Sequence, residues 1–237
     1  MSNARRNFIA GGVVGLASVA AWRSADRKGL LPPDAQGLYG VGHSLTYATH
    51  RLLTGRANAR EFSRDQISKI PHPNGKPPES EDFRRLQANG FAGWQLQVEG
   101  LVSRPGSFSL ATLKAQPSRS QITQLICEEG WSYIAEWTGT PLAHLLELTG
   151  VRAQARYMIA YAFDGWVDSI DLDDAIHPQT LLTYGMNSAD LSVVHGGPLR
   201  LRVPRQLGYK SLKYVNRITF TDRLKEEASS YSWYAGI

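Results

Sequence analysis

The chain has only one cysteine, Cys127, among its 237 residues. A single cysteine excludes an internal disulfide, and it also excludes a cysteine-rich zinc site or an iron–sulfur cluster held by this chain alone. No run of five or more Lys or Arg residues occurs, although the net charge is +5 and the pI is near 9.4. We therefore attribute the excess of basic over acidic residues to solubility and to the binding of an anionic ligand, and we expect no nucleic-acid partner. Repeats and low-complexity tracts are absent too, and 20% charged with 10% aromatic residues is the composition of a folded protein.

The first thirty residues differ in character from the rest. Arg5 and Arg6 precede a Gly- and Ala-rich apolar stretch that ends near Trp22. This pattern resembles a twin-arginine export signal, which predicts a periplasmic protein that folds before export. The stretch is short for a membrane-spanning helix, which needs about 20 apolar residues. One alternative is that this segment is an amphipathic N-terminus of a cytosolic protein. A second is that it stays attached as a membrane tether, because no clean cleavage site follows Ala17–Ala21.

From residue 94 onward the apolar pattern predicts short strands and helices. Trp94, Leu96 and Val98 alternate with polar residues, which is typical of a half-buried strand. Further strands are predicted over 122–127, 157–163, 180–185, 199–203 and 215–221, and helices over 110–113, 141–149 and 172–177, with a basic helical pattern over 56–64. Thr140 is expected to cap the second of these helices. The balance predicts a mixed, strand-rich α+β fold with a single domain over residues 31–225, an N-terminal segment 1–30 and a peripheral tail 226–237.

The segment around Cys127 is the most unusual in the sequence. The cysteine ends an apolar strand pattern and is followed by Glu128, Glu129 and Gly130. A lone buried cysteine is most often an inert core thiol. Turn-forming and acidic residues directly after it place the thiol at the end of a strand beside a cleft, which suits a nucleophile or a metal thiolate.

A second segment, over residues 195–213, combines glycine turns with basic side chains. Leu199, Leu201 and Val203 alternate with Arg200 and Arg202, which places both arginines on the outward face of a strand. A glycine loop with two lysines follows at 208–213. Backbone amides and cations that converge on a loop form an anion site, most often for phosphate, whereas a hairpin with solvated charges is the plainer alternative.

Together these segments resemble the sulfite oxidase family of molybdopterin enzymes, in particular its small bacterial periplasmic members. The matching motifs are Cys127 with Gly130-Trp131-Ser132, then Trp137-Thr138-Gly139-Thr140-Pro141-Leu142, then His177 to Met186, His195-Gly196-Gly197-Pro198-Leu199-Arg200, and Gly208-Tyr209-Lys210-Ser211-Leu212-Lys213. They follow the family's order over most of residues 94–221. The resemblance implies a molybdenum–molybdopterin cofactor and transfer of an oxygen atom to or from sulfur, with sulfite or a sulfoxide as the substrate type.

The resemblance also implies roles for individual residues. Cys127 would bind molybdenum as a thiolate, and a soft sulfur ligand suits this metal. Residues that would hold the pterin and its phosphate are His195, Arg200, Lys210, Ser211 and Lys213, with Ser44 and Tyr47 as a less closely matching upstream pair. Candidates on the substrate side are His43, His50, Trp131 and Tyr133. Because the chain has no haem-binding domain, its electron partner would be a separate haem protein, either a membrane cytochrome of the b type or a soluble cytochrome c.

Two other classes of function remain open at this point. A cysteine hydrolase would use Cys127 with His144, His177 or His195, but it would leave the basic loops without a purpose. A non-catalytic member of the fold would bind an anion or a partner protein.

Overall fold

The structure is a computed structural model that describes residues 18–25, 45, 48–49, 51–53 and 57–222. The chain divides into two compact units, Met1–Ala57 and Asn58–Ile237. The described residues of the first unit, up to residue 53, are helical. Within the described residues, no helix has the length and apolar character needed to cross a bilayer. The expected boundaries near residues 30 and 225, and the arginine pair of the export signal, lie outside the described residues and stay predictions.

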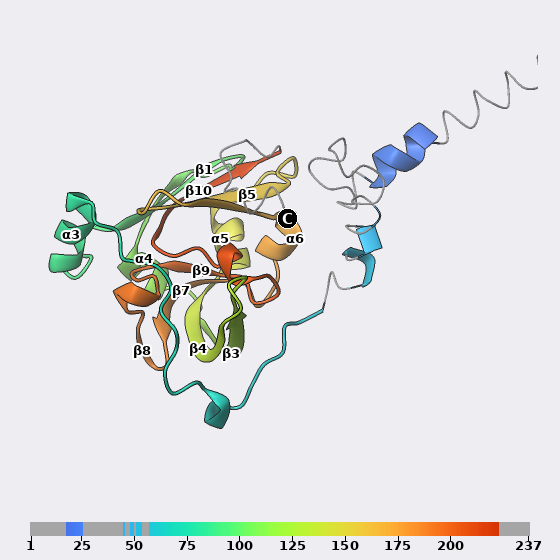
Figure 1. The fold of residues 1–237 in the computed structure, drawn as a ribbon. Coiled ribbons are helices and arrows are strands. Elements are labelled where there is room, and N and C mark those ends of the chain that lie inside the picture. The colour runs from blue at the N-terminus through green and yellow to red at the C-terminus, as the bar shows by residue number, and fades with distance from the viewer. Residues whose placement is uncertain (1–17, 26–44, 46–47, 50, 54–56, 223–237) are drawn as a thin grey trace, which may run out of the picture. The chain divides into compact units, whose positions relative to one another are not determined.

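Two five-stranded sheets form the second unit (Figure 1). The first sheet has the order β2-β1-β10-β5-β6, with β1 and β10 parallel and the other pairs antiparallel. Its strands are β1 (Gln95–Gly100), β2 (Gly106–Ser109), β5 (Tyr157–Ala162), β6 (Val167–Asp171) and β10 (Val215–Thr221). The second sheet is antiparallel, with the order β3-β4-β7-β8 and with β9 paired to β7. Its strands are β3 (Arg119–Ile126), β4 (Ser132–Pro141), β7 (Leu181–Met186), β8 (Ala189–Asp190) and β9 (Arg200–Arg202).

Short helices precede the first strand or connect later strands. They are η1 (Arg64–Gln66), α3 (Glu81–Ala88), α4 (Leu110–Lys114), α5 (Leu142–Thr149), α6 (Leu172–Ala175), η2 (Val193–His195) and η3 (Gly208–Lys210). In Figure 1, α5 lies between the sheet of β1, β10 and β5 and the sheet of β7 and β9. The main core joins these elements, because Leu96 of β1, Leu145 of α5, Leu182 of β7 and Ile218 of β10 are fully buried in one cluster. Burial of this apolar surface is the main force that holds the two sheets together.

The alternating strand patterns correctly predict β1 and most of the later strands. The strand that was predicted over 122–127 is β3, and those over 157–163, 180–185, 199–203 and 215–221 are β5, β7, β9 and β10, with shifted ends. Ser109 caps α4, since its hydroxyl accepts a hydrogen bond from the Thr112 amide at 3.0 Å. The strand-rich α+β class is therefore confirmed.

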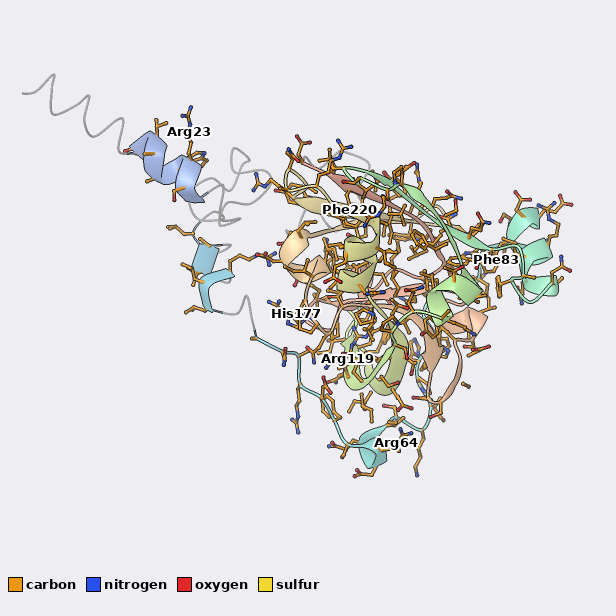
Figure 2. All side chains as sticks on the ribbon, turned by 180° about the vertical axis from the view of Figure 1, so that it is seen from behind. Arg23, Arg64, Phe83, Arg119, His177 and Phe220 are labelled. Atoms are coloured by element: carbon orange, nitrogen blue, oxygen red, sulfur yellow. The ribbon has the colours of Figure 1, made fainter. Side chains whose placement is uncertain are left out.

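Two local predictions are wrong. Thr140 does not cap α5, because it is the penultimate residue of β4 and its hydroxyl donates to the Leu113 carbonyl at 2.9 Å, so that Pro141 is the N-cap. The basic stretch over 56–64 is not a helix in its described part. Residues 57–63 run along the second sheet, where Glu61 bridges to Thr123, and the side chain of Arg64 in η1 (Figure 2) pairs with Glu136 at 2.6 Å.

Candidate functional site

Cys127 lies directly after β3, at the turn where this strand leaves the second sheet. Its amide donates to the Trp131 carbonyl at 2.9 Å, and its carbonyl accepts from the Gly130 amide at 3.2 Å. Gly130 has φ of +90°, a conformation that L side chains rarely adopt, which explains the glycine at this turn. Cys127 itself is 5% exposed. The thiol is therefore at the end of a strand beside a cavity, as the sequence predicts.

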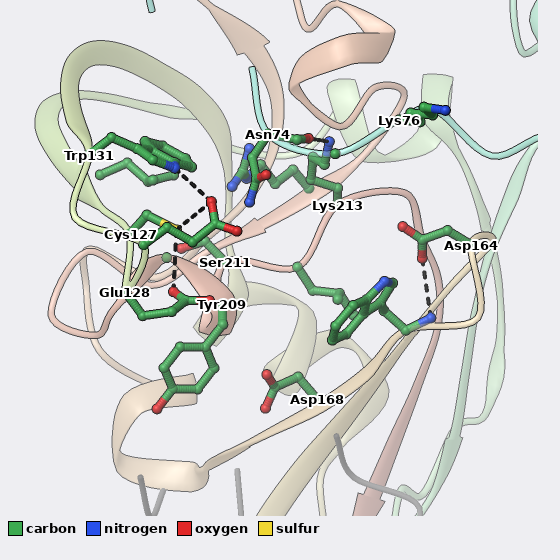
Figure 3. Close-up of a pocket in the computed structure, with 17 residues that line it drawn as sticks. Asn74, Lys76, Cys127, Glu128, Trp131, Asp164, Asp168, Tyr209, Ser211 and Lys213 are labelled. Carbon is green, nitrogen blue, oxygen red and sulfur yellow. Dashed lines mark hydrogen bonds between the residues drawn. The ribbon is translucent and has the colours of Figure 1, made fainter. Parts of the chain in front are cut away.

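Two carboxylates face the thiol (Figure 3). Cys127 Sγ is 3.4 Å from Glu128 Oε2 and 3.9 Å from Glu129 Oε2, and Glu129 Oε2 also accepts from Trp131 Nε1 at 2.8 Å. Burial raises the pKa of the thiol to about 11, and the two acidic side chains act in the same direction. The free thiol is therefore protonated at neutral pH, and a bound cation is needed to hold it as a thiolate.

A cavity of about 330 Å³ opens beside Cys127. Its walls come from five segments of the chain: residues 74–76, 125–131, 164–168, Arg200 and 208–213. Figure 3 shows Cys127 and Trp131 on one side of this cavity and Lys76 and Asp164 on the other. The segments converge from both sheets and from the loop before α3, so the cavity depends on the complete fold of the second unit.

Arg200 and Arg202 are buried in β9, which corrects the prediction that they face outward. Their side chains do lie opposite the aliphatic face, but that second face is covered, and both guanidinium groups pack on the Trp137 ring at 5.6 and 5.2 Å. Arg200 reaches the cavity wall. Its Nη1 donates to the His195 carbonyl at 2.9 Å, while its buried Nε has no hydrogen-bond partner. Among residues 57–222, neither arginine forms a salt bridge with a carboxylate.

Arg200 brings a positive charge to the cavity wall, and Arg202 lies two residues further along β9, outside the lining. Burial lowers the pKa of Arg200, and burial together with the charge of Arg200 lowers the pKa of Arg202 to about 9. Both groups are still cationic at neutral pH. A buried cation without an opposite charge is costly, and an anion in the cavity would relieve that cost.

Ser211 and Lys213 also line the cavity, from the loop after η3. Ser211 is buried, and its hydroxyl accepts from the Val203 amide and from Arg202 Nη1, both at 3.2 Å. Lys213 Nζ donates to the carbonyls of Asn74 and Val194, the latter at 3.2 Å. Burial and the nearby charge of Arg200 lower the pKa of Lys213 to about 8.

Lys210 points away from this group of cations. Its ammonium is fully buried, 2.9 Å from Asp168 Oδ1 and 2.7 Å from the Ser169 carbonyl. Asp168 lies at the cavity wall, whereas Lys210 lies behind it. Of the predicted phosphate contacts, the structure thus brings Arg200, Ser211 and Lys213 to the cavity and pairs Lys210 with an acid that the sequence analysis did not identify.

His195 lies next to the cavity rather than in its wall. Its Nδ1 is 2.9 Å from the Ser192 hydroxyl, and its ring contacts Tyr133 edge-on at 6.1 Å. Its buried Nε2 has no hydrogen-bond partner, and burial lowers its pKa. Ser44 and Tyr47, and likewise His43 and His50, lie outside the described residues.

An aromatic row leads inward from the thiol. Trp131 stacks on Tyr133 with the rings 6.0 Å apart, and Tyr133 contacts Trp137 at 5.9 Å. Trp131 lines the cavity and Tyr133 is buried behind it. Of the two described candidates for the substrate side, Trp131 is thus the one with access to the cavity.

No thiol–imidazole pair is present in the part of the chain that the structure describes. The Cys127 thiol interacts with Glu128 and Glu129, while His144 bonds to Gln116 and His195 to Ser192. His177 accepts the Gln179 amide through Nδ1. The geometry therefore gives no support to a cysteine hydrolase, which needs its base within hydrogen-bond reach of the sulfur.

Comparison with known proteins agrees with this geometry. Residues 85–229 match the family described as "Oxidoreductase molybdopterin binding domain". The protein-methionine-sulfoxide reductase catalytic subunit of Xanthomonas campestris is 32% identical over 61% of this chain and 52% of that protein. The subunit of the same name from Ralstonia nicotianae is 29% identical over 92% of this chain and 69% of its own length. The chain thus spans between about half and about two thirds of these longer relatives.

A solved structure shares the fold. The sulfane dehydrogenase SoxCD from Paracoccus pantotrophus superimposes with a TM-score of 0.54 at 24% identity, over 56% of this chain and 39% of that one. This similarity supports the arrangement of strands around the cavity.

Proposed function

This chain belongs to the family of oxidoreductase molybdopterin-binding domains, and we propose that it is a molybdenum enzyme that reduces a sulfoxide to a thioether. The observation that carries the proposal is the pairing, at one cavity, of a soft sulfur ligand with the buried Arg200, which has no carboxylate partner within residues 57–222; Arg202, two residues further along β9, has none there either. A thiolate is a preferred ligand of a soft or high-valent metal, and uncompensated cations are suited to a phosphate dianion. The cavity therefore provides separate places for the two ends of a metal–pterin phosphate.

The described residues fit this cofactor. Cys127 would bind the molybdenum, and Arg200, which has no carboxylate partner within residues 57–222, would bring a positive charge at the cavity wall to the phosphate. Ser211 and Lys213 would add a hydroxyl and a second positive charge from the loop after η3. His195, with its free Nε2, would contact the pterin from the side of Tyr133. When bound, the cofactor supplies the two-electron chemistry at sulfur and oxygen.

The chain's own residues favour a neutral sulfur substrate over an anionic one. Glu128 and Glu129 place two acidic groups within 4 Å of the thiol, so that an anion such as sulfite would meet repulsion there. Trp131 and the half-exposed Trp166 line the cavity, and sulfur groups make favourable contacts with aromatic rings. The names of the relatives support methionine sulfoxide, free or within a protein, as the substrate.

The net reaction takes up two electrons and two protons, and it yields one thioether and one water per sulfoxide. The electrons would come from a separate haem protein, a membrane cytochrome of the b type or a soluble cytochrome c. We further propose export by the twin-arginine route to the periplasm, on the basis of Arg5 and Arg6.

Purified full-length protein tests the proposal. We expect molybdenum and molybdopterin in the preparation, and reduction of methionine sulfoxide when reduced viologen supplies electrons. Sulfite oxidation with ferricyanide as acceptor should be absent or far slower. A preparation free of molybdenum after expression in a cofactor-producing host would overturn the proposal in favour of a non-catalytic anion-binding protein. Faster turnover of sulfite than of sulfoxide would overturn the choice of substrate.

A further inference from the structure

Arg202 is a second buried arginine for which the family resemblance provides no role. It is 0% exposed, lies in β9, and shares the Trp137 ring with Arg200. Unlike Lys210, which is neutralised by Asp168, it has no salt bridge within residues 57–222. Its charge therefore contributes to the field in the cavity without a compensating carboxylate.

The hydrogen bonds of Arg202 join two segments that line the cavity. Nη1 donates to the Ser211 hydroxyl at 3.2 Å, and Nη2 donates to the Gln124 carbonyl at 2.6 Å and to the Thr123 hydroxyl at 3.3 Å. Ser211 belongs to the loop after η3, whereas Thr123 and Gln124 belong to the strand that ends next to Cys127. One side chain thus fixes the expected phosphate side of the cavity relative to the expected metal side.

The charge of Arg202 is costly in the empty protein. A buried cation without an opposite charge is unfavourable to desolvate, and its hydrogen bonds to Gln124, Thr123 and Ser211 offset only part of that cost. The cost is further offset when an anion binds nearby.

From these contacts we infer that Arg202 is a positioning residue for the anionic cofactor. It holds Ser211 and the end of β3 in register across the cavity, and its charge stabilises the bound phosphate and raises the reduction potential of the metal. This inference rests on the proposed function for the identity of the ligand. It goes beyond the proposed function because it assigns the second positive charge near the phosphate to Arg202 rather than to Lys210.

The test compares Arg202→Met with Arg202→Lys and with the control Arg217→Met. Arg217 is a half-exposed arginine of β10, paired with Glu99 at 3.2 Å. The readouts are the affinity of the cofactor-free protein for purified molybdopterin, the melting temperature of the cofactor-free protein, and the midpoint potential of molybdenum in the loaded protein.

We expect Arg202→Met to bind molybdopterin about tenfold more weakly, as the loss of one unit charge near an anion predicts. Its cofactor-free form should melt below the parent's temperature, because the Gln124 carbonyl and the hydroxyls of Thr123 and Ser211 lose a donor, and its molybdenum potential should shift to more negative values. Arg202→Lys should retain the parent's potential, because it retains the charge, while losing part of the affinity. Arg217→Met should match the parent in cofactor affinity and in potential.

Two results would overturn the inference. One is an Arg202→Met protein with unchanged affinity and potential, and the other is an Arg202→Lys protein whose potential falls as far as that of Arg202→Met. If the parent holds no molybdopterin, the proposed function fails, and inorganic phosphate binding to the cofactor-free protein decides the inference separately. Tighter phosphate binding by the parent than by Arg202→Met would support it, and equal binding would contradict it.

Discussion

The buried pair of Lys210 and Asp168 gives the sharpest prediction about how the cavity wall is built. Lys210 Nζ is 0% exposed at the side chain and Asp168 only 4%, and the two groups are 2.9 Å apart. Replacing Lys210 by Met removes the ammonium and leaves the Asp168 carboxylate buried without its ion-pair partner. The Ser169 carbonyl, which accepts from the same ammonium at 2.7 Å, loses a donor as well.

The size of the effect follows from this burial. Removing one partner of a buried ion pair costs about 3–5 kcal/mol, because the remaining charge is uncompensated. For a protein of this size, 1 kcal/mol corresponds to roughly 2–4 °C in melting temperature, so Lys210→Met should melt about 6–20 °C below the parent. In the double variant Lys210→Met/Asp168→Asn no charge remains unpaired, and most of this loss should be recovered.

Thermal unfolding of the cofactor-free proteins measures these differences, and molybdopterin affinity is measured on the same preparations. The double variant should bind molybdopterin within about threefold of the parent, because Lys210 does not line the cavity and the two substitutions together leave the net charge beside it unchanged. The reasoning is refuted if Lys210→Met has the same melting temperature as the parent but fails to bind the cofactor. That result would identify Lys210 as a phosphate ligand, as the family resemblance implies.

Three further predictions use other parts of the chain. The pKa of Lys213 is lowered to about 8, so its positive charge is lost as the pH rises through 8, and phosphate affinity of the cofactor-free protein should fall between pH 7 and pH 8.5. Arg202, with a pKa lowered to about 9, loses only a smaller part of its charge in this range, so Lys213→Arg should show a clearly smaller fall. An equal fall in both proteins would exclude Lys213 as its source. Gly139→Ala places a Cβ 2.3 Å from the Leu182 carbonyl oxygen and should destabilise the fold by about 1–3 kcal/mol in denaturant unfolding, while the control Gly106→Ala meets no atom within 4 Å and should not. Replacing both Arg5 and Arg6 by Lys should leave folded, cofactor-loaded protein in the cytoplasm on cell fractionation, and normal delivery to the periplasm would argue against the twin-arginine route.

The sequence predicts those elements whose local pattern agrees with their final environment. The alternation of Leu96 and Val98 with polar residues matches β1, which is buried on one face only. In contrast, β4 was not predicted. Its burial pattern does not alternate cleanly, and it contains Glu136, a buried carboxylate whose partners, Arg64 and Ser188, lie 72 and 52 residues away in sequence.

At the candidate site too, the sequence predicts local features but not contacts between residues that are distant in sequence. The position of Cys127 after a strand and before a turn is a local feature, and the sequence predicts it correctly. The burial of Arg202 depends on Trp137 covering the second face of β9, and the pairing of Lys210 depends on Asp168, 42 residues earlier. Such partners are set by the packing of the two sheets, and no spacing in the sequence identifies them.

X-ray absorption at the molybdenum edge tests the central claim most directly, because it counts the sulfur atoms bound to the metal. In Cys127→Ser the contacts of Arg200, Ser211 and Lys213 to the cofactor are unchanged, so the protein should retain molybdopterin. Its molybdenum should have one sulfur neighbour fewer than in the parent, and sulfoxide reduction should fall by orders of magnitude. The same number of sulfur neighbours in both loaded proteins would show that Cys127 does not bind the metal, and it would contradict the account.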